Sequence, residues 1–311
     1  MAASSRAGIA LLRARASRAL ASWPALGLLL LAAAAPRPAA PAPAPEPPAV
    51  AKRVVSLNPS LTRILVAIGA RDALVGIDDY SARAEPSVAD LPRVGGLYAP
   101  SLEAVVALAP DLVVLVPSVE QQAFRTRLEQ LGVPVLALAG DPVRFEGVLA
   151  AIETLGRRTG HDAEAHARVT AIREARDAVR RATAGLPRPR AVLVLQREPL
   201  FVVGRGSFLD EMLRIAGAEN LGAALGDPWP RASLEWLVAQ APEVLLDSDG
   251  DPQPAHDFWS RWPSLPAVRD GRVVALDEGT ITMPGPDLDR ALWRLARALH
   301  GEALAREAGG R

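Results

Sequence analysis

The stretches SLEAVVALAPDL (residues 101–112) and SLEWLVAQAPEV (residues 233–244) repeat one pattern, with every position offset by 132 residues and no gap. Ser, Leu, Glu, Val, Ala, Ala and Pro coincide, and Asp111 is matched by Glu243. In each copy a helical pattern stops at the proline, because a helix cannot easily continue through it, and an apolar strand pattern follows at once. Two copies in register predict two related α/β lobes, and chance similarity between Ala-rich helices is the alternative.

Short β-branched runs alternate with helical patterns along the rest of the chain. They predict strands at residues 53–57, 74–77, 112–116, 135–138, 191–195, 201–203, 244–247 and 273–276. Alternating strands and helices are typical of parallel sheets that helices cover on both faces. The fold class we predict is α/β, with two Rossmann-like lobes built on central, mostly parallel sheets.

One long helix is predicted between the two repeat copies. Residues 161–184 contain no Pro or Gly, and Gly185 offers a C-terminal stop. At 1.5 Å per residue this helix is about 36 Å long, enough to join the lobes as a rigid strut. We therefore expect an N-terminal lobe (52–160), an inter-lobe helix (161–185) and a C-terminal lobe (186–305). A surface helix belonging to one lobe is the alternative.

The first 51 residues have the composition of an exported protein. Residues 1–35 combine a basic start without acidic residues and an apolar run of eleven at residues 25–35, the pattern of a signal peptide. A membrane span needs about 20 apolar residues, so an uncleaved anchor is the weaker alternative. Residues 36–51 form a Pro/Ala-rich leader, which we expect to be extended. The predicted location is the periplasm, without lipidation because the chain has no cysteine.

Composition and motifs exclude several classes of function. Lys and Arg number 35, as do Asp and Glu, so net charge gives no reason to expect nucleic acid as a partner. The absence of cysteine removes disulfides and thiolate metal sites. No G-x-S-x-G elbow, P-loop or full dinucleotide fingerprint is present, and no nucleophile–base set emerges, so we expect a binding module rather than an enzyme. The four histidines, at positions 161, 166, 256 and 300, are predicted to be surface residues, with no metal site.

Aromatic residues in loops are the first candidates for ligand binding. In open parallel sheets, ligands lie beyond the carboxyl ends of the strands. Tyr80 and Tyr98, the only two tyrosines, fall in loops predicted at that edge, and Trp229 lies between Pro228 and Pro230 in the equivalent loop of the second lobe. Aromatic faces hold a flat macrocycle with little loss of side-chain entropy. The alternative is that each of the three rings only covers the core of its own lobe.

Four further candidates lie near the predicted cleft: Asn58, Ser60, Phe201 and Phe208. Asn58 and Ser60 begin the first helix, where capping is the alternative role, although free N–H groups there can also meet a polar ligand group. The two phenylalanines flank the glycine-rich turn at residues 204–207, which brings backbone close to whatever fills the cleft.

Three segments carry a resemblance to a known family: residues 53–77 (RVVSLNPSLTRILVAIGARDALVGI), 95–114 (GGLYAPSLEAVVALAPDLVV) and 227–246 (DPWPRASLEWLVAQAPEVLL). Over residues 52 to about 305 the chain resembles the periplasmic binding proteins whose lobes are joined by one backbone helix, and which serve ABC importers of metal chelates and cobalamin. The Pro-Trp-Pro around Trp229 is similar to the cobalamin-binding branch. The segment at 95–114 is shared with siderophore and haem binders, so ferric siderophore and haem remain alternative cargoes.

The resemblance implies cobalamin or a related corrinoid as a transported ligand, with no covalently bound cofactor. It also implies polar ligand contacts near residues 277–287, where this sequence departs from the family and offers Thr282.

Glu103 and Glu235 occupy the same position in the two repeat copies, just after the candidate N-cap residues Ser101 and Ser233. A carboxylate in a first helical turn complements the helix dipole, and this role alone is the alternative. The resemblance implies that each lobe presents one such glutamate to an arginine pocket of one permease subunit. The implied partner is an ABC permease dimer with its ATPase, and the binding protein is expected to be a monomer.

Overall fold

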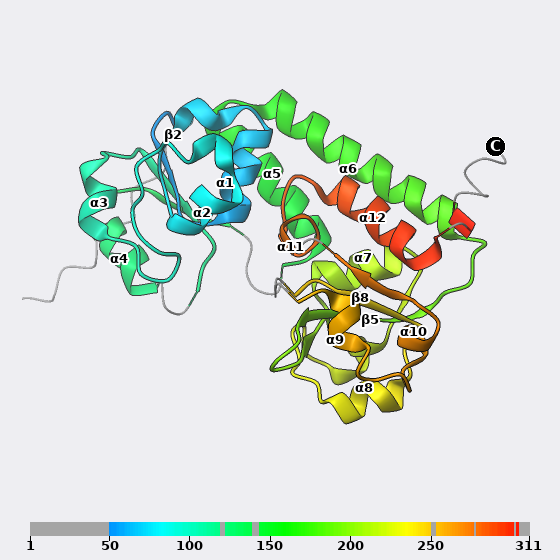
Figure 1. The fold of residues 1–311 in the computed structure, drawn as a ribbon. Coiled ribbons are helices and arrows are strands. Elements are labelled where there is room, and N and C mark those ends of the chain that lie inside the picture. Colours follow the sequence, from blue (N-terminus) through cyan, green and yellow to red (C-terminus); the bar gives the residue numbers. More distant parts are fainter. Residues whose placement is uncertain are drawn as a thin grey trace, which may run out of the picture. The chain divides into compact units, whose positions relative to one another are not determined.

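The computed structural model describes residues 50–118, 122–138, 143–249, 253–276, 278–301 and 303–304 (Figure 1). The expected signal peptide (1–35) and most of the leader (36–51) lie outside the described residues, as does Asp277. None of the helices within the described ranges is both long enough and apolar enough to cross a membrane.

The N-terminal lobe is built on a four-stranded, fully parallel sheet. Its strand order is β2-β1-β3-β4, and the strand bounds are β1 Val54–Ser56, β2 Leu74–Ile77, β3 Leu112–Leu115 and β4 Val135–Ala137. Alternate residues of β1 and β3 pack on opposite faces: Val54 and Val114 belong to one apolar cluster, and Val55 and Val113 belong to another. Burial on both faces explains why these strands read as continuous apolar runs.

Helices cover both faces of this sheet. The bounds are α1 Pro59–Ala67, α2 Asp79–Ala84, α3 Leu102–Ala107, α4 Gln122–Gln130 and α5 Phe145–Thr159, with 3₁₀ turns η1 Ala70–Ala73 and η2 Pro86–Val88. α1 and α5 pack on one face, and α3 and α4 contribute Val105 and Leu128 to the cluster on the other.

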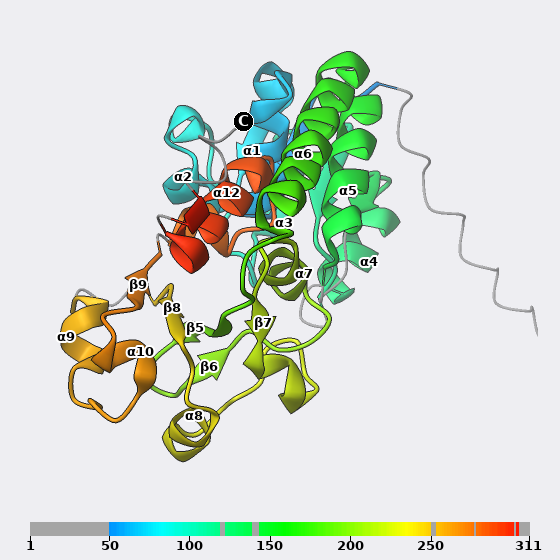
Figure 2. The ribbon, with the colours of Figure 1, turned by 90° about the vertical axis from the view of Figure 1, so that its right-hand side faces the viewer.

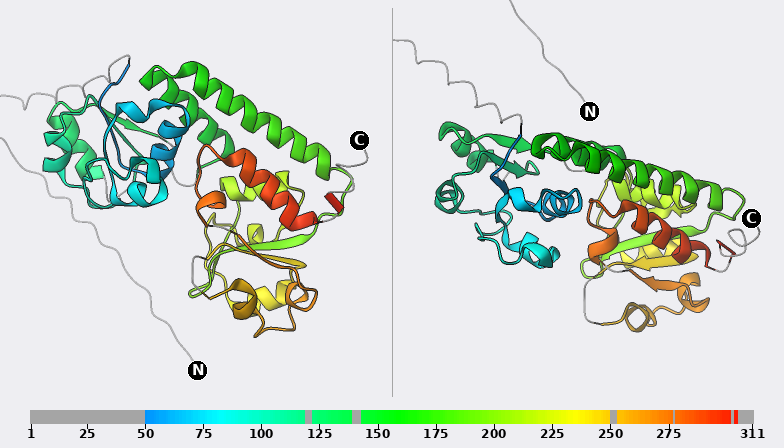
Figure 3. Two further views of the ribbon diagram at one scale, coloured as in Figure 1. Left: turned by 45° about the horizontal axis from the view of Figure 1, so that its top comes forward. Right: turned by 90° about the horizontal axis from the view of Figure 1, so that it is seen from above.

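The predicted inter-lobe helix is α6, Asp162–Thr183. It packs against α5 of the first lobe and against α12 (Leu288–His300), near the end of the chain, and all the views in Figures 1 to 3 show α6 and α12 side by side. The α5–α6 turn is tight: a methyl group added at Gly156 would lie 2.4 Å from the Cβ of Ala165. Gly156 therefore sets how closely the first lobe approaches the long helix.

The C-terminal lobe contains a five-stranded, mixed sheet. The order is β6-β5-β8-β9, with β7 also pairing with β5, and the bounds are β5 Arg190–Gln196, β6 Phe201–Val202, β7 Glu219–Asn220, β8 Val244–Asp247 and β9 Val273–Ala275. β6 is antiparallel to β5, unlike the other pairs, because the short turn at residues 197–200 is long enough only for a hairpin. The expectation of mostly parallel sheets is confirmed, and β7 was not predicted.

The helices of the second lobe repeat the layering of the first. Their bounds are α7 Phe208–Ile215, α8 Leu234–Gln240, α9 Ala255–Trp259, α10 Pro266–Arg269, α11 Glu278–Ile281 and α12, with the 3₁₀ turn η3 Leu221–Leu225. α7 and α12 share a cluster with one face of β5 and β8, and α8 and α9 pack on the other face. In Figures 1 and 2, α8 lies across the sheet from α12.

The sequence repeat is present as matched structure in the two lobes. The hydroxyl groups of Ser101 and Ser233 cap α3 and α8, each accepting a hydrogen bond from the backbone N–H three residues on (3.2 and 3.1 Å). Residues 101–108 and 233–240 show the same order of exposed, intermediate and buried positions. The similarity between the copies therefore extends to the way each helix packs on its sheet.

Both copies also end in the same way. Ala109 and Ala241 have left-handed backbone, with φ of 44° and 46°, which turns the chain from the helix into the following strand. The carboxylate of Asp111 then accepts hydrogen bonds from two backbone N–H groups just before β1 (2.8 and 3.0 Å). The carboxylate of Glu243 accepts one backbone N–H, that of Arg190 at the start of β5 (2.9 Å). In each lobe the matched acidic residue thus binds the backbone at the start of a central strand.

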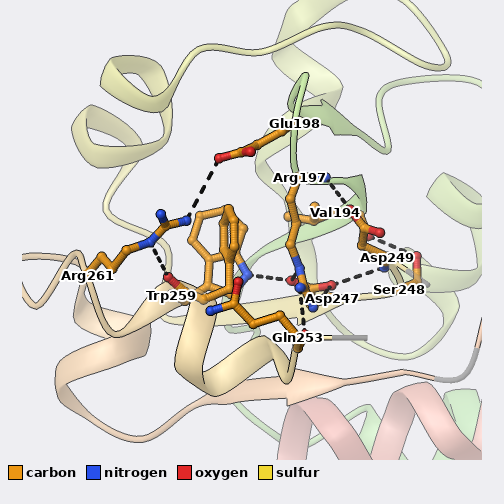
Figure 4. Close-up of polar contacts among 10 residues, drawn as sticks. Val194, Arg197, Glu198, Asp247, Ser248, Asp249, Gln253, Trp259 and Arg261 are labelled. Carbon is orange, nitrogen blue, oxygen red and sulfur yellow. Dashed lines mark hydrogen bonds and ion pairs between the residues drawn. The ribbon is translucent and has the colours of Figure 1, made fainter. Parts of the chain in front are cut away.

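A buried polar network closes the carboxyl ends of β5 and β8 (Figure 4). The Nε of Arg197 lies 3.0 Å from Oδ2 of Asp247, and both side chains are almost completely buried. Asp247 also accepts the indole N–H of Trp259, and Arg197 donates to the carbonyl oxygen of Gln253 at 2.7 Å. A buried charge pair is tolerated when each group has several partners. The network joins the carboxyl ends of β5 and β8 to α9 through Trp259.

Candidate ligand-binding cleft

A cavity of about 510 Å³ is lined by residues from both lobes, within the size range of small-molecule sites. The first lobe contributes the β1–α1 and β3–α4 connections and one side of α5, and the second lobe contributes Phe208, Trp229 and the segment before α12. The lining residues are Asn58, Ser60, Leu61, Ile64, Leu97, Tyr98, Val116, Pro117, Ser118, Val143, Val148, Ala151, Phe208, Trp229, Thr282 and Pro284. Six of the eight predicted ligand-binding residues are among them.

Asn58 and Ser60 reach the cavity through the cap of α1. Asn58 has extended backbone, and its side chain accepts the N–H of Ser60 at 2.9 Å, while Pro59 occupies the first turn. The capping role considered for Asn58 is therefore confirmed, and the N–H of Ser60 already has a partner. What these residues offer to the cavity is their side-chain polar groups.

Trp229 is held in place by the turn on which it lies. The carbonyl oxygens of Pro228 and Pro230 accept hydrogen bonds from Gly204 and Val202 (2.9 and 3.2 Å). A Cβ at Gly204 would lie 1.8 Å from the carbonyl oxygen of Asp227, so only glycine permits this close approach. The glycine-rich turn thus acts on the cleft indirectly, by fixing the loop that carries Trp229.

The other two aromatic residues on the cavity differ in exposure. Tyr98 is 63% exposed, whereas Phe208, the first residue of α7, is buried. The hydroxyl group of Ser207 caps α7 by accepting the N–H of Asp210 at 3.2 Å, which fixes the start of the helix and with it Phe208. Tyr98 is thus an exposed residue at the rim of the cavity, and Phe208 is part of its wall.

Tyr80 and Phe201 lie outside this cavity. Tyr80 is exposed on α2, where the guanidinium of Arg83 lies 4.5 Å from its ring centroid. Phe201 lies in β6 and is paired with Gln196 across the hairpin. Tyr80 follows the strand predicted at 74–77, and Phe201 begins the strand predicted at 201–203, but α2 and the hairpin carry them away from the lining. The arrangement of the described residues gives no support for a ligand contact by either.

Most of the apolar lining was not identified from the sequence. Leu61 and Ile64 come from α1, and Val148 and Ala151 come from α5, in each case at a spacing of three residues. This spacing also describes a core-facing helix stripe, so the sequence carries no signal that separates cavity wall from core.

No charged side chain is among the described residues that line the cavity. Its polar groups are amide, hydroxyl, phenol and indole groups, and the rest of the surface is aliphatic or aromatic. Among the described residues, no group of three or more His, Asp or Glu is arranged to hold a metal ion. The lining suits a large, amphipathic ligand that brings few charges of its own.

The histidine expectation is wrong for two of the four residues. His161 and His300 are half-buried rather than on the surface. His300 hydrogen-bonds the carbonyl oxygen of Ala216 at 2.8 Å, and burial lowers its pKa. Both lie at helix ends that pack against other elements, where a partly apolar ring is accommodated. Neither lines the cavity.

One wall of the cavity is bound to the opposite lobe. Arg63 of α1 donates to the carbonyl oxygen of Gly279 at 2.8 Å and forms an ion pair with Asp287, and its Nη1 lies 3.6 Å from the sulfur of Met283. The segment between Gly279 and Asp287 carries Thr282 and Pro284. Arg63 therefore connects the helix that supplies Leu61 and Ile64 to the loop that faces them.

The inter-lobe helix holds the same segment from a second direction. Arg168 of α6 donates to the carbonyl oxygen of Pro286 at 2.7 Å and forms an ion pair with Asp289. Two arginines outside the C-terminal lobe thus fix this loop, although its residues come more than 100 positions later in the chain.

Glu103 and Glu235 lie outside the cavity, exposed on α3 and α8. The hydroxyl group of Ser101 lies 3.2 Å from the carboxylate of Glu103. The backbone N–H of Glu235 and the hydroxyl group of Ser233 lower the pKa of the Glu235 carboxyl group. Glu235 therefore stays negatively charged at a pH below the ordinary range of a glutamate.

Two α/β lobes, one connecting helix and a cavity lined by both lobes are the architecture of a solute-binding protein. Residues 54–280 match the model of the periplasmic binding protein family, so the chain belongs to that family. Members of this family bind solutes and are not enzymes, as the motif analysis predicted.

Individual relatives and solved structures within this family show what the chain is similar to. The vitamin B12-binding protein of Vibrio parahaemolyticus serotype O3:K6 (strain RIMD 2210633) is 27% identical over 263 residues, covering 82% of this chain and 91% of that protein. A periplasmic haem-binding protein from Roseiflexus sp. RS-1 superimposes with a TM-score of 0.71 at 26% identity, covering 81% of this chain and 99% of that one. The periplasmic vitamin B12-binding protein of Vibrio cholerae has a TM-score of 0.70 at 24% identity, covering 85% and 99%, and supports the fold.

Proposed function

We propose that this protein captures cobalamin or a related corrinoid in the inter-lobe cavity and delivers it to an ABC permease. The observation that carries the cargo proposal is the cavity lining, which combines Tyr98, Phe208 and Trp229 with neutral polar groups and includes no described charged side chain. The relative from Vibrio parahaemolyticus, named for vitamin B12, supports the same cargo.

The chemistry of a corrinoid matches this lining. A corrin ring is a broad, flat macrocycle whose edge carries neutral amides. Aromatic side chains from both lobes offer faces to the ring, and burial of large apolar area against rigid side chains costs little conformational entropy. The side chains of Asn58, Ser118 and Thr282 lie on the same lining and can exchange hydrogen bonds with amides at the ring edge.

Haem is the second candidate cargo, and Tyr98 is the observation that favours it. A phenol on the cavity rim is a group that can ligate haem iron. The haem-binding protein from Roseiflexus has the same fold. Haem also carries two propionates, however, and buried anions need cationic or multiple hydrogen-bonding partners. The described lining offers no cation, so the corrinoid is favoured, and ferric siderophore remains a same-fold alternative.

A titration of the purified mature chain with cyanocobalamin, haem and a ferric siderophore tests the cargo. Of the five tryptophans in the described part of the chain, Trp229 alone lines the cavity, so its quenching should report binding, and a Trp229→Phe variant should lose most of the signal. Saturable cyanocobalamin binding is expected. If no corrinoid binds more tightly than about 10 μM (roughly −7 kcal/mol), the cargo assignment is wrong.

We also propose that the chain reaches the periplasm by way of residues 1–35, and docks there through Glu103 and Glu235. One exposed carboxylate on the equivalent helix of each lobe is a pseudo-symmetric arrangement, which suits a receptor built from two equivalent subunits. Charge pairs across such an interface fix the register of docking and speed the encounter.

Charge reversal separates docking from binding. Glu103→Lys combined with Glu235→Lys should abolish cyanocobalamin uptake by cells while leaving the affinity of the purified protein unchanged, because neither residue lines the cavity. Glu174→Lys makes the same charge change at an exposed position of α6 and should leave both uptake and affinity intact. A loss of affinity in the double variant would assign the glutamates to the fold or the cleft instead.

A further inference from the structure

α3 and α8 each display an exposed valine beside the exposed glutamate. Val106 is 39% exposed and Val238 is 38% exposed, and the two occupy equivalent positions in the repeat. Each follows its glutamate by three residues, a spacing that places both side chains on one face of a helix. The residues just before them, Val105 and Leu237, are fully buried, so the cores of the two lobes do not need Val106 and Val238.

Matched exposure separates these valines from ordinary surface residues. Six large apolar side chains are exposed in the described part of the chain: Val50, Tyr80, Tyr98, Val106, Leu131 and Val238. Only Val106 and Val238 are equivalent to one another in the repeat. Single exposed apolar side chains are common and need no explanation, whereas the same residue at the same exposure in both lobes requires one.

We propose that Val106 and Val238 form the apolar half of two equivalent docking faces, each completed by its glutamate, for the two membrane subunits of the permease. The partner surface has a cationic side chain beside apolar side chains in each subunit. This inference rests on the delivery role proposed above and adds the contacts that keep the complex together.

Charge and shape define the partner. Glu103 is the only charged residue of α3, and Glu235 is the only one of α8, so each face combines one negative charge with aliphatic surface. On α8 the surface is hollowed around Glu235 and Val238, a depression lined otherwise by Leu234 and Ala239. Exposed charge pairs mainly steer an encounter, whereas buried apolar side chains at the centre of an interface slow dissociation.

Substitution of the valines by asparagine tests the proposal in cells that carry this chain and its importer. Val106→Asn and Val238→Asn should each lower uptake of radiolabelled cyanocobalamin about tenfold, and the double variant about a hundredfold. Cyanocobalamin affinity of the purified variants should stay within twofold of the original chain. Leu131→Asn removes an exposed apolar side chain that has no repeat partner, and should change neither quantity.

A cross-linking experiment measures docking to the permease directly, whatever the cargo is. The chain contains no cysteine, so Ala107→Cys or Ala239→Cys places a single thiol beside either valine. With a photo-cross-linker on that thiol and membranes from the same cells, we expect adducts with an ABC permease subunit from both positions. Excess unlabelled protein should compete, and the double asparagine substitution should reduce the yield at least tenfold.

The outcomes distinguish the two proposals. Unchanged uptake and cross-linking in the double variant, with cyanocobalamin binding intact, would overturn the role of the valines. An adduct between two copies of the chain would overturn it in favour of self-association. If the original chain binds no cyanocobalamin, the cargo proposal fails, and the cross-linking yield still decides the docking surface.

Discussion

Asp78 follows β2 and caps α2, and it has no exposed surface. Its carboxylate accepts the backbone N–H groups of Tyr80 and Ser81 at 2.8 and 3.0 Å. The hydroxyl group of Ser81 also donates to it, and is linked onward to Thr62 and Ser56. Burial raises the pKa of Asp78, partly offset by these hydrogen bonds. The network fixes the β1–α1 connection that brings Asn58 to the cleft, at the cost of burying a carboxylate.

The pH dependence of stability should reveal this cost. The folded state binds the Asp78 proton more tightly than the unfolded state, so the contribution of Asp78 to the free energy of unfolding falls as pH rises from about 3.8 through the raised pKa. Each pKa unit of elevation corresponds to about 1.4 kcal/mol. Asp78→Asn keeps the cap acceptor, so it should be more stable than the original chain at pH 8, with the gap closing towards pH 4.

Urea unfolding at several pH values measures this difference. Asp90→Asn is the matched control, because Asp90 is exposed and pairs only with Arg71 at the surface, where such pairs contribute about 0–1 kcal/mol. A gap between Asp78→Asn and the original chain that stays constant with pH would contradict the assignment.

At the scale of elements, the contact between α5 and α6 sets the geometry of the connection between the lobes. Gly156 lies on α5 where the helix faces Ala165 of α6 and the carbonyl oxygen of His161. Gly147, on the same helix, has only the methyl group of Val143 nearby, at 3.5 Å. The fold therefore requires a residue without a side chain at position 156, but it leaves room for one at position 147.

Alanine substitution should separate the two glycines. Gly156→Ala would place a methyl group 2.4 Å from the Cβ of Ala165, and the required shift of α6 should destabilise the protein by about 1–3 kcal/mol. Gly147→Ala meets only an ordinary van der Waals contact and should stabilise the protein by about 0.5–1 kcal/mol through helix propensity. Denaturant midpoints of the two variants give the comparison, and equal effects would show that the α5–α6 contact can relax.

At the scale of the whole molecule, the loop before α12 makes contacts on both sides of the cavity. It follows the C-terminal sheet in sequence, but Arg63 of α1 and Arg168 of α6 bind it. Because the loop carries Thr282, these arginines fix the width of the cleft at one wall. Arg63 thus adds a connection between the lobes to the one that α6, which carries Arg168, provides.

Removal of the Arg63 contact should loosen the cleft. Arg63→Ala should speed cyanocobalamin release and weaken affinity about three- to tenfold, because the loop with Thr282 is no longer held against α1. Stopped-flow release rates measure the effect, and small-angle scattering follows the cleft width. Asp287→Ala should behave in the same way, and the double variant should add little. Arg71→Ala, whose partner Asp90 lies in the same lobe, should leave release unchanged.

The sequence by itself determined the two-lobed α/β fold, the long inter-lobe helix and the positions of the matched glutamates. Each depends on short-range signals: a proline that ends a helix, a serine that caps one, or an apolar period that identifies a helix or strand. The predicted inter-lobe helix at 161–185 and the observed Asp162–Thr183 differ by one or two residues at each end, within the normal fraying of helix termini.

Only the tertiary structure decided which side chains face the cavity. It brought Tyr98, Phe208, Trp229 and Thr282 together, left Tyr80 and Phe201 outside, and added the sides of α1 and α5. It also paired Arg63 with Asp287, 224 positions apart in the chain. Apolar residues that line a cavity obey the same periodicity as those that fill a core, and contacts across such separations are set by how helices pack on sheets. Local pattern therefore fixes the elements, and packing between distant elements fixes the site.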